Sequence, residues 1–237
     1  MPLVQKKSQT EKLWVYTVLP PLILNIGSFF TYGAYYALNY TQPEWVAGIT
    51  PGAVRAATDI LIFVVEWAFS IAIILRYRKS GLSLTRLIAP EGNPRCFRWD
   101  PTLLLFVGWN LLFALYMLVM SRLYPTVTDV YQGLSLEIRL LQLTLIPVTA
   151  AFCEELIWRA YIPTRMELHG YRFWPVVLLS SLSFATIHGI FLPDKLLVTF
   201  LLGVLAAVYY LKERNLIPVI FTHWFVDVWS FGLFMFG

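Results

Sequence analysis

Seven long apolar runs, separated by short polar breaks, dominate the sequence and restrict the chain to a membrane-spanning fold. A helix needs about 20 mainly apolar residues to cross the ~30 Å hydrocarbon layer of a bilayer. The chain is also 58% hydrophobic and 14% charged, whereas soluble domains average about 45–50% apolar and about 25% charged residues. We therefore expect an all-α polytopic transmembrane bundle of about seven spans. The runs are 13–38, 53–75, 102–123, 138–162, 173–190, 196–211 and 217–236.

Basic residues alternate between the segments that connect these runs. Fourteen of the 18 Lys and Arg residues fall in residues 1–12, 76–100, 159–172 and 212–214. Because loops rich in Lys and Arg stay on the cytoplasmic side, we expect a single integral membrane domain over residues 1–237, in the cell (plasma) membrane, with a cytoplasmic N-terminus. Pro20 and Pro21 interrupt the first run and the sixth run is short, so an eighth, re-entrant piece remains open.

Charge and cysteine content exclude two other classes of protein. The net charge of +4 is scattered over short loops and forms no basic stripe, which excludes a nucleic-acid binder. Cys96 lies in a basic loop and Cys153 in an apolar run, and no CxxC pair occurs, which excludes a disulfide scaffold. The expected partner is the lipid bilayer, and the sequence does not indicate an oligomeric state.

Six ionisable side chains cluster in the fourth, fifth and seventh apolar runs, where each costs roughly 2.5–3.5 kcal/mol on insertion scales and is by default a functional candidate. Glu155 and Arg159 are four residues apart, in the order that favours an ion pair on one helical face, which leaves the neighbouring acid free. His223 and Asp227 have the same spacing. The full set is Glu154, Glu155, Arg159, His188, His223 and Asp227.

This set contains the groups needed to activate a water molecule and to stabilise an oxyanion, namely a free carboxylate, two histidines and a further carboxylate on three helices. Structural interpretations remain open for each part. The acid and arginine residues could anchor a helix end, His188 could be a satisfied core histidine, and His223 with Asp227 could fasten two helices. The alternative functions are a non-enzymatic immunity or scaffold protein and a proton-coupled small-solute carrier.

The same residues form three motifs that resemble the signatures of the CPBP family, which comprises type II CAAX prenyl proteases and bacteriocin-processing or immunity relatives called Abi proteins. Residues 153–159 (CEELIWR) resemble EExxxR, residues 184–188 (FATIH) resemble FxxxH, and residues 223–227 (HWFVD) resemble HxxxN/D. Gly203 stands where the family has a glycine, and residues 215–218 resemble the turn before the last motif. The resemblance covers roughly residues 145–227.

The resemblance implies an intramembrane endopeptidase of the glutamate type. Glu154 would be the general base, with His188 holding the same water molecule. Glu155 and Arg159 would support the base. His223 and Asp227 would face the oxyanion, but relatives often have Asn at the last position. Because an ionised Asp has no proton to donate, Asp227 either is protonated or orients His223.

The implied substrate is a membrane-associated peptide or protein tail. CAAX-like C-terminal trimming fits if the host prenylates proteins, and processing of a bacteriocin, a pheromone or a sorting-signal tail fits otherwise. We expect no cofactor. A rival mechanism would place Zn²⁺ on His188, His223 and a carboxylate. The HExxH motif is absent, and the spacing of the two histidines supports neither the zinc nor the metal-free mechanism. We favour the metal-free mechanism.

Two further groups of polar residues lie inside apolar runs. Asp59 and Glu66 are seven residues apart on one helical face, so they either hydrogen-bond to another helix or line the substrate path. Three serines of the fifth run lack a GxSxG context, and we interpret them as small residues that permit close helix packing. They are Ser180, Ser181 and Ser183.

The depth of the candidate residues raises one question. At ~1.5 Å rise per residue, Glu154 lies about 12 Å from residue 162 and His223 about 9 Å from residue 217, but His188 lies about 22 Å from residue 173. Their convergence therefore requires that the fifth helix begins later, at Pro175, or is tilted.

Overall fold

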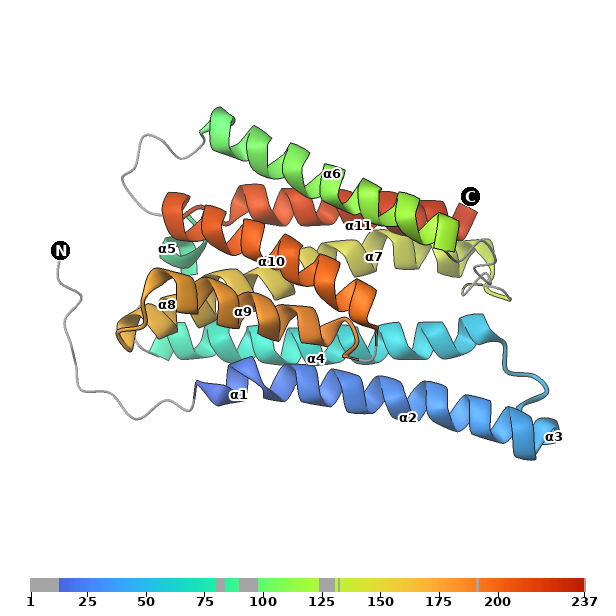
Figure 1. Cartoon of the computed structure of the whole chain (residues 1–237). Helices are drawn as coiled ribbons and strands as arrows, with labels where there is room; N and C mark the ends of the chain where they lie inside the picture. Colours follow the sequence, from blue (N-terminus) through green and yellow to red (C-terminus); the bar gives the residue numbers. More distant parts are fainter. Residues whose placement is uncertain are drawn as a thin grey trace.

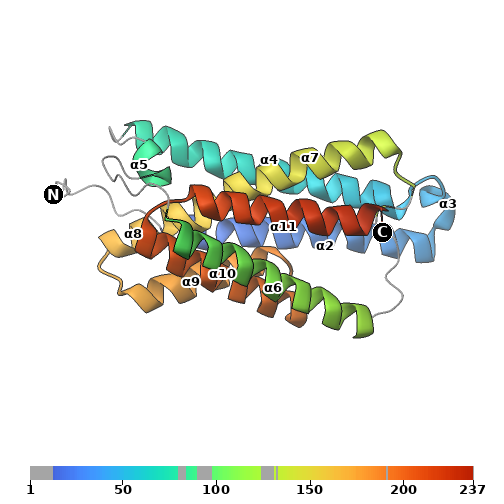
Figure 2. The ribbon, with the colours of Figure 1, turned by 90° about the horizontal axis from the view of Figure 1, so that it is seen from above.

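The structure is a computed structural model that describes residues 13–79, 84–89, 98–123, 131, 133–190 and 192–236. Within these residues all regular secondary structure is helical, and there is no strand. Five helical segments are long and apolar enough to cross a membrane, and two shorter apolar helices accompany them. The long helices lie side by side along one common direction (Figures 1 and 2). The expected all-α membrane bundle is confirmed, and each of the seven apolar runs corresponds to one of these segments.

The helices follow the predicted runs closely. In chain order they are α1 (Trp14–Thr17), α2 (Leu19–Thr41), α3 (Pro43–Val46), α4 (Pro51–Lys79), α5 (Leu84–Ile88), α6 (Trp99–Leu123), α7 (Leu136–Glu154), the π-helical segment η1 (Glu155–Tyr161), α8 (Ile162–Leu168), α9 (Phe173–Ile187), α10 (Pro193–Glu213) and α11 (Ile217–Phe236).

The two prolines of the first run lie at the start of α2. In the first turn of a helix a missing backbone N–H costs nothing, because that group has no partner within the helix. The turn α1 and the helix α2 therefore form one apolar span, Val15–Thr41.

The fourth span is longer than the sequence indicated. Helix α7, η1 and α8 follow one another without a break over Leu136–Leu168, whereas the apolar run ended at residue 162. The hydrophobicity of the run stops there, but the helix continues because its last turns are buried by protein. Ile162, Pro163 and Met166 are among the buried residues of α8.

Helices α9 and α10 form a short hairpin, and the turn between them lies part-way along the bundle rather than at its end (Figures 1 and 2). A Cβ atom at Gly203 of α10 would lie 3.0 Å from Cβ and 3.2 Å from Cα of Ser181 in α9. Ser180 donates a hydrogen bond to the Val176 carbonyl oxygen of its own helix at 2.8 Å. The predicted role in close helix packing is supported at Ser181.

The core of the molecule surrounds η1. Trp158 and Tyr161 of this segment are buried against α9, α10 and the C-terminal half of α4, and Ile73 of α4 belongs to the same cluster. By contrast, α2 and α6 keep large apolar side chains exposed, such as Phe29 and Leu104. These surfaces suit contact with lipid.

Candidate active site

The first motif lies at the junction between α7 and η1, near the middle of the longest helix. Glu154 is the last residue of α7, and Glu155 and Arg159 belong to η1. Short π-helical insertions in α-helices occur frequently at functional sites, because the widened turn redirects side chains. All three side chains are buried, with Glu155 and Arg159 at most 1% exposed.

The ion pair expected within this motif is present. Arg159 Nε lies 3.1 Å from Glu155 Oε2, and the Arg159 guanidinium carbon lies 3.6 Å from the centre of the Phe184 ring. The positive charge is therefore balanced by one carboxylate and by the negative face of an aromatic ring. Neither contact involves the Glu154 carboxyl group.

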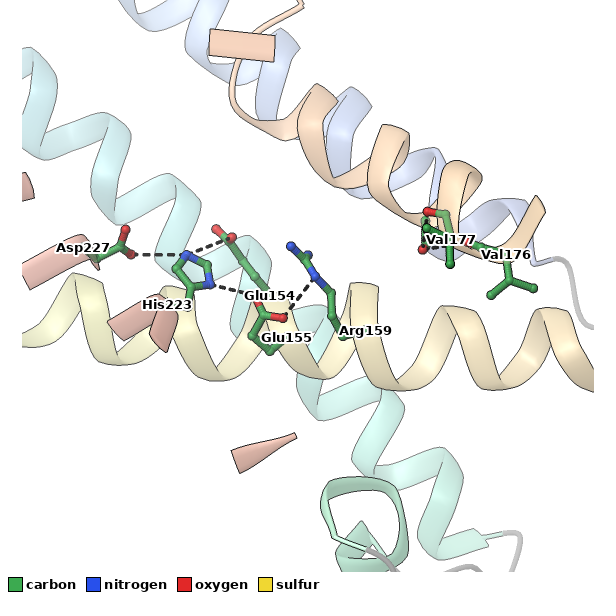
Figure 3. A network of polar contacts seen from close by, with 8 residues as sticks. Glu154, Glu155, Arg159, Val176, Val177, His223 and Asp227 are labelled. Atoms are coloured by element: carbon green, nitrogen blue, oxygen red, sulfur yellow. Dashed lines mark hydrogen bonds and ion pairs between the residues drawn. The ribbon is translucent and has the colours of Figure 1, made fainter. Parts of the chain in front are cut away.

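His223 of α11 connects the acids of two helices (Figure 3). Its Nδ1 atom lies 2.7 Å from Glu155 Oε1, which is a short charge-assisted hydrogen bond. Its Nε2 atom lies 3.5 Å from Asp227 Oδ2 and 3.8 Å from Glu154 Oε2. One imidazole thus faces three carboxyl groups, two of them on its Nε2 side.

The sequence predicted that His188 lies within the fifth helix. In the structure it lies directly after Ile187, the last residue of α9. Its Nδ1 atom lies 3.2 Å from the Phe184 carbonyl oxygen, four residues earlier. The Phe184 ring packs against both histidines, with its centre 4.8 Å from that of His188 and 6.2 Å from that of His223. The second and third motifs therefore meet through this phenylalanine.

The observed helix lengths bring the depths of Glu154 and His188 into agreement. Helix α9 begins at Phe173, so Pro175 is not its first residue, and His188 lies about 22 Å from that start at ~1.5 Å per residue. The fourth span continues to Leu168, which places Glu154 at a similar depth of about 20 Å from its end. The error lay in the predicted end of the fourth span.

Helices outside the three motifs also supply side chains to this centre. Trp109 of α6 is 1% exposed and covers His223, with ring centres 5.5 Å apart. Glu66 of α4 is 2% exposed, and its side chain reaches the Glu154 carboxyl group within hydrogen-bonding distance. The sequence marked Glu66 as an acid within a span but gave no sign that it would face this site.

Asp59 lies two turns before Glu66 on α4 and has a different environment. It forms an ion pair of 2.9 Å with Arg55 and accepts a hydrogen bond of 3.1 Å from Gln142 of α7. The prediction that one of these acids hydrogen-bonds to another helix is confirmed for Asp59.

The end of α9 is held from outside by α2. Asn25 donates a hydrogen bond to the Thr186 carbonyl oxygen at 2.6 Å, and its own amide oxygen accepts one from the Ile190 N–H at 3.3 Å. These two bonds bracket His188, so Asn25 fixes the turn that carries it. No sequence motif identifies this contact.

The rival zinc mechanism would use His188, His223 and a carboxylate. Among the described residues no group of three or more His, Cys, Asp or Glu side chains is arranged to hold a metal ion.

The fold and this site define a polytopic helical membrane protein with a buried cluster of acids and imidazoles. Residues 136–229 match the family described as type II CAAX prenyl endopeptidase, Rce1-like. This segment is therefore a domain of that family, and the resemblance carried by the three motifs is confirmed. No curated protein and no solved structure matches the chain.

The family assigns a general activity to this segment. The match supports the interpretation of this segment as an intramembrane endopeptidase of the CAAX type, with a membrane-associated substrate and a lipid environment. The first three long helices lie outside the matched residues, although α4 and α6 contribute Glu66 and Trp109 to the site.

Proposed function

We propose that the chain is an intramembrane endopeptidase of the glutamate type, in which Glu154 activates the hydrolytic water molecule. The observation that carries this proposal is the division of labour between two adjacent acids. Glu155 is held by Arg159 and by His223 Nδ1, whereas Glu154 has no contact with a cationic side chain shorter than 3.8 Å among the described residues. One carboxylate is structural and its neighbour is available to accept a proton.

The contacts of His223 support its role at the oxyanion. A carboxylate only accepts hydrogen bonds, so the 2.7 Å contact requires that Nδ1 carries a proton and donates it to Glu155. Glu155 thereby stabilises an imidazolium, whose second N–H is at Nε2. That proton can be donated to a carbonyl oxygen as it gains negative charge.

Asp227 is better suited to orient His223 than to donate to an oxyanion. Its Oδ2 atom lies 3.5 Å from Nε2. At this distance the carboxylate attracts the imidazolium and holds the ring in place, while the Nε2–H is left to donate to the oxyanion. Of the two roles left open by the sequence, we propose orientation of His223.

His188 can hold the water molecule opposite Glu154. Its Nδ1 atom donates to the Phe184 carbonyl oxygen, because a carbonyl oxygen only accepts. This contact leaves Nε2 unprotonated in the neutral ring and able to accept a hydrogen bond from water. The Asn25 contacts described above fix the turn that carries the ring.

The reaction proceeds in two steps in this proposal. Glu154 takes a proton from water while the water oxygen forms a bond to the carbonyl carbon, and the carbonyl electron pair moves to the oxygen that faces His223. Glu154 then transfers the same proton to the amide nitrogen as the C–N bond breaks. The products are a carboxylic acid and an amine, and the site returns to its initial state.

We propose a membrane-associated peptide or protein tail as the substrate. We also propose that this chain resides in the plasma membrane with its N-terminus on the cytoplasmic side. The basic loops support this orientation. A cysteine introduced at the exposed loop residue Tyr171, in a Cys96→Ser background, should react with a membrane-impermeant maleimide only from the cytoplasmic side. Reaction from the opposite side would reverse the orientation.

The proposal is tested by comparing the wild type with Glu154→Gln and His188→Ala in proteoliposomes. The substrate is a farnesylated peptide with a CAAX end, and released peptide is measured by mass spectrometry. Because general acid–base catalysis contributes about 10²–10⁴-fold, each variant should lose at least about a hundredfold in rate. Glu167→Gln is the control, since Glu167 pairs with Arg214 at the surface.

Cleavage by both variants at the wild-type rate would reject the mechanism. If the wild type does not cleave this peptide, the termini of membrane peptides should be compared between cells that express the wild type and Glu154→Gln. A carrier would instead show proton-coupled uptake without a new terminus. Loss of activity with a chelator and its recovery with Zn²⁺ would favour the zinc mechanism over the metal-free one.

A further inference from the structure

Glu66 brings a second buried carboxyl group against the proposed base. It lies on α4, outside the residues that match the protease family. Its carboxyl group faces that of Glu154, and α4 meets α7 at the adjacent contact of Trp67 Nε1 with Thr149 Oγ1, at 3.4 Å. Both acids are at most 5% exposed. Its Oε1 atom has no hydrogen-bond partner among the described residues. An acid in this position is costly unless it has a role.

The charges around Glu66 do not neutralise it. Arg159 is paired with Glu155 and stacked on Phe184, and Arg55 is paired with Asp59. The titratable groups that interact with Glu66 or Glu154 come from α4, α7, η1, α10 and α11, and they are Asp59, Cys153, Arg159, Lys195, His223 and Asp227.

Two carboxyl groups in contact in an apolar environment cannot both be ionised, so such a pair holds one proton between them. The proton then forms a strong O–H···O hydrogen bond. Only one member of the pair is free to act as a base. Glu154 is the member that also faces His223 Nε2, at 3.8 Å.

We propose that Glu66 is a positioning residue that keeps the shared proton and donates its hydrogen bond to the Glu154 carboxylate. This inference rests on the proposed function and deepens it, because it makes the base a pair formed by α4 and α7. Glu66 does not contact the substrate and retains its proton throughout the cycle. Its donor fixes the Glu154 carboxylate toward the water molecule and keeps it ionised.

The test uses Glu66→Gln and Glu66→Met in the full-length protein in proteoliposomes. The amide of Gln can donate the same hydrogen bond, so Glu66→Gln should keep kcat within about threefold of the wild type. Met fills similar space without a donor. Because hydrogen bonds to charged groups contribute about 1.5–3 kcal/mol, Glu66→Met should lower kcat by at least about tenfold with KM unchanged.

Ser70→Ala is the matched control. Ser70 lies one turn further along α4 and is fully buried, so its loss perturbs the same helix without touching the acid pair. It should leave kcat and KM unchanged. A purely structural role of Glu66 would instead reduce the folded fraction, with no recovery specific to Gln.

A second measurement does not depend on activity. Infrared spectroscopy of the wild type at neutral pH should show the C=O band of a protonated carboxyl group, and Glu66→Gln should remove the intensity of one such group. Ser70→Ala should retain it. This band would persist even if the chain proved not to be a protease, so the two proposals can fail separately.

Three results would overturn the inference. If Glu66→Gln loses as much activity as Glu154→Gln, Glu66 is itself the base. If Glu66→Met retains the wild-type kcat, the donor is not needed. If Glu66→Gln leaves the infrared band unchanged, Glu66 does not hold the proton, and this result stands even where Glu66→Met does not fold.

Discussion

The family segment and the helices that precede it differ in how they use their apolar surface. In the most apolar stretch of Leu136–Leu168 and of α10, 56% and 50% of the residues are buried. The corresponding fractions are 17%, 33% and 11% for Val15–Thr41, α4 and α6. The segment that carries the motifs is thus enclosed by protein, and the first three spans mostly face outward.

The outer helices nevertheless place a few side chains against the candidate active site. Asn25 of α2 holds the turn that carries His188, Glu66 of α4 meets Glu154, and Trp109 of α6 covers His223. In the proposed mechanism the motif helices supply the reacting groups, and single polar or aromatic side chains of the outer helices contact these groups. Sequence variation in the outer helices is tolerable wherever a side chain faces lipid.

The sharpest test of this comparison uses two ion pairs with the same spacing, one in each region. Arg159→Leu leaves Glu155 fully buried with only its His223 contact, and breaking a buried pair costs about 3–5 kcal/mol. Arg55→Leu should cost less than half of that, because Asp59 keeps its bond to Gln142 and Arg55 is 26% exposed. The measurement is the thermal unfolding midpoint of purified protein in detergent.

A double variant checks the cause of the larger effect. Arg159→Leu combined with Glu155→Leu removes both charges, so it should recover most of the stability lost by Arg159→Leu but not the activity, since His223 loses its Glu155 contact. Equal destabilisation by Arg55→Leu and Arg159→Leu would contradict the difference between the two regions.

Two glycines test whether the two regions differ in how tightly their helices are packed. Gly203→Ala places a methyl group 3.0–3.2 Å from Ser181 atoms, and such overpacking typically costs about 1–3 kcal/mol. Gly33→Ala in α2 meets no atom within 4 Å, so it should stabilise the helix by about 0.5–1 kcal/mol. The two changes should shift the unfolding midpoint in opposite directions. A common direction would mean that both regions are packed alike.

The smallest expected effect concerns the hold of α2 on the His188 turn. Asn25→Ala removes two hydrogen bonds to α9 and its following turn. Polar contacts between membrane helices average about 0.6 kcal/mol, so peptide cleavage should fall only about two- to fivefold. Asn39→Ala, at an exposed position of the same helix, should cleave at the wild-type rate. Equal rates in both variants would show that α2 does not position His188.

Much of the fold was predictable because lipid imposes one solution on a long apolar run. Backbone groups in a bilayer have to be satisfied within the helix, so seven apolar runs predicted seven helical segments with nearly correct ends. The largest error was the end of the fourth span, since burial by protein extends that helix to Leu168 beyond the apolar run.

Pairs within one helix were predictable for a related reason. The spacing of Glu155 and Arg159, and of His223 and Asp227, fixes their common face through helical geometry alone. Both contacts are present. His188, by contrast, was expected inside a helix and lies just after its end. Apolar residues continue past this end, so the apolar run does not mark where the helix stops.

The sequence by itself determined that this chain is a membrane protein. It also determined the positions of the long apolar helices and the acids and histidines that are candidates for catalysis. Only the tertiary structure decided that His223 Nδ1 meets Glu155, that Phe184 joins the two histidines and that Glu66 lies against Glu154. The reason is physical. Periodicity fixes the face of a helix on which a side chain stands, whereas the height and rotation of one helix against another depend on how their surfaces pack.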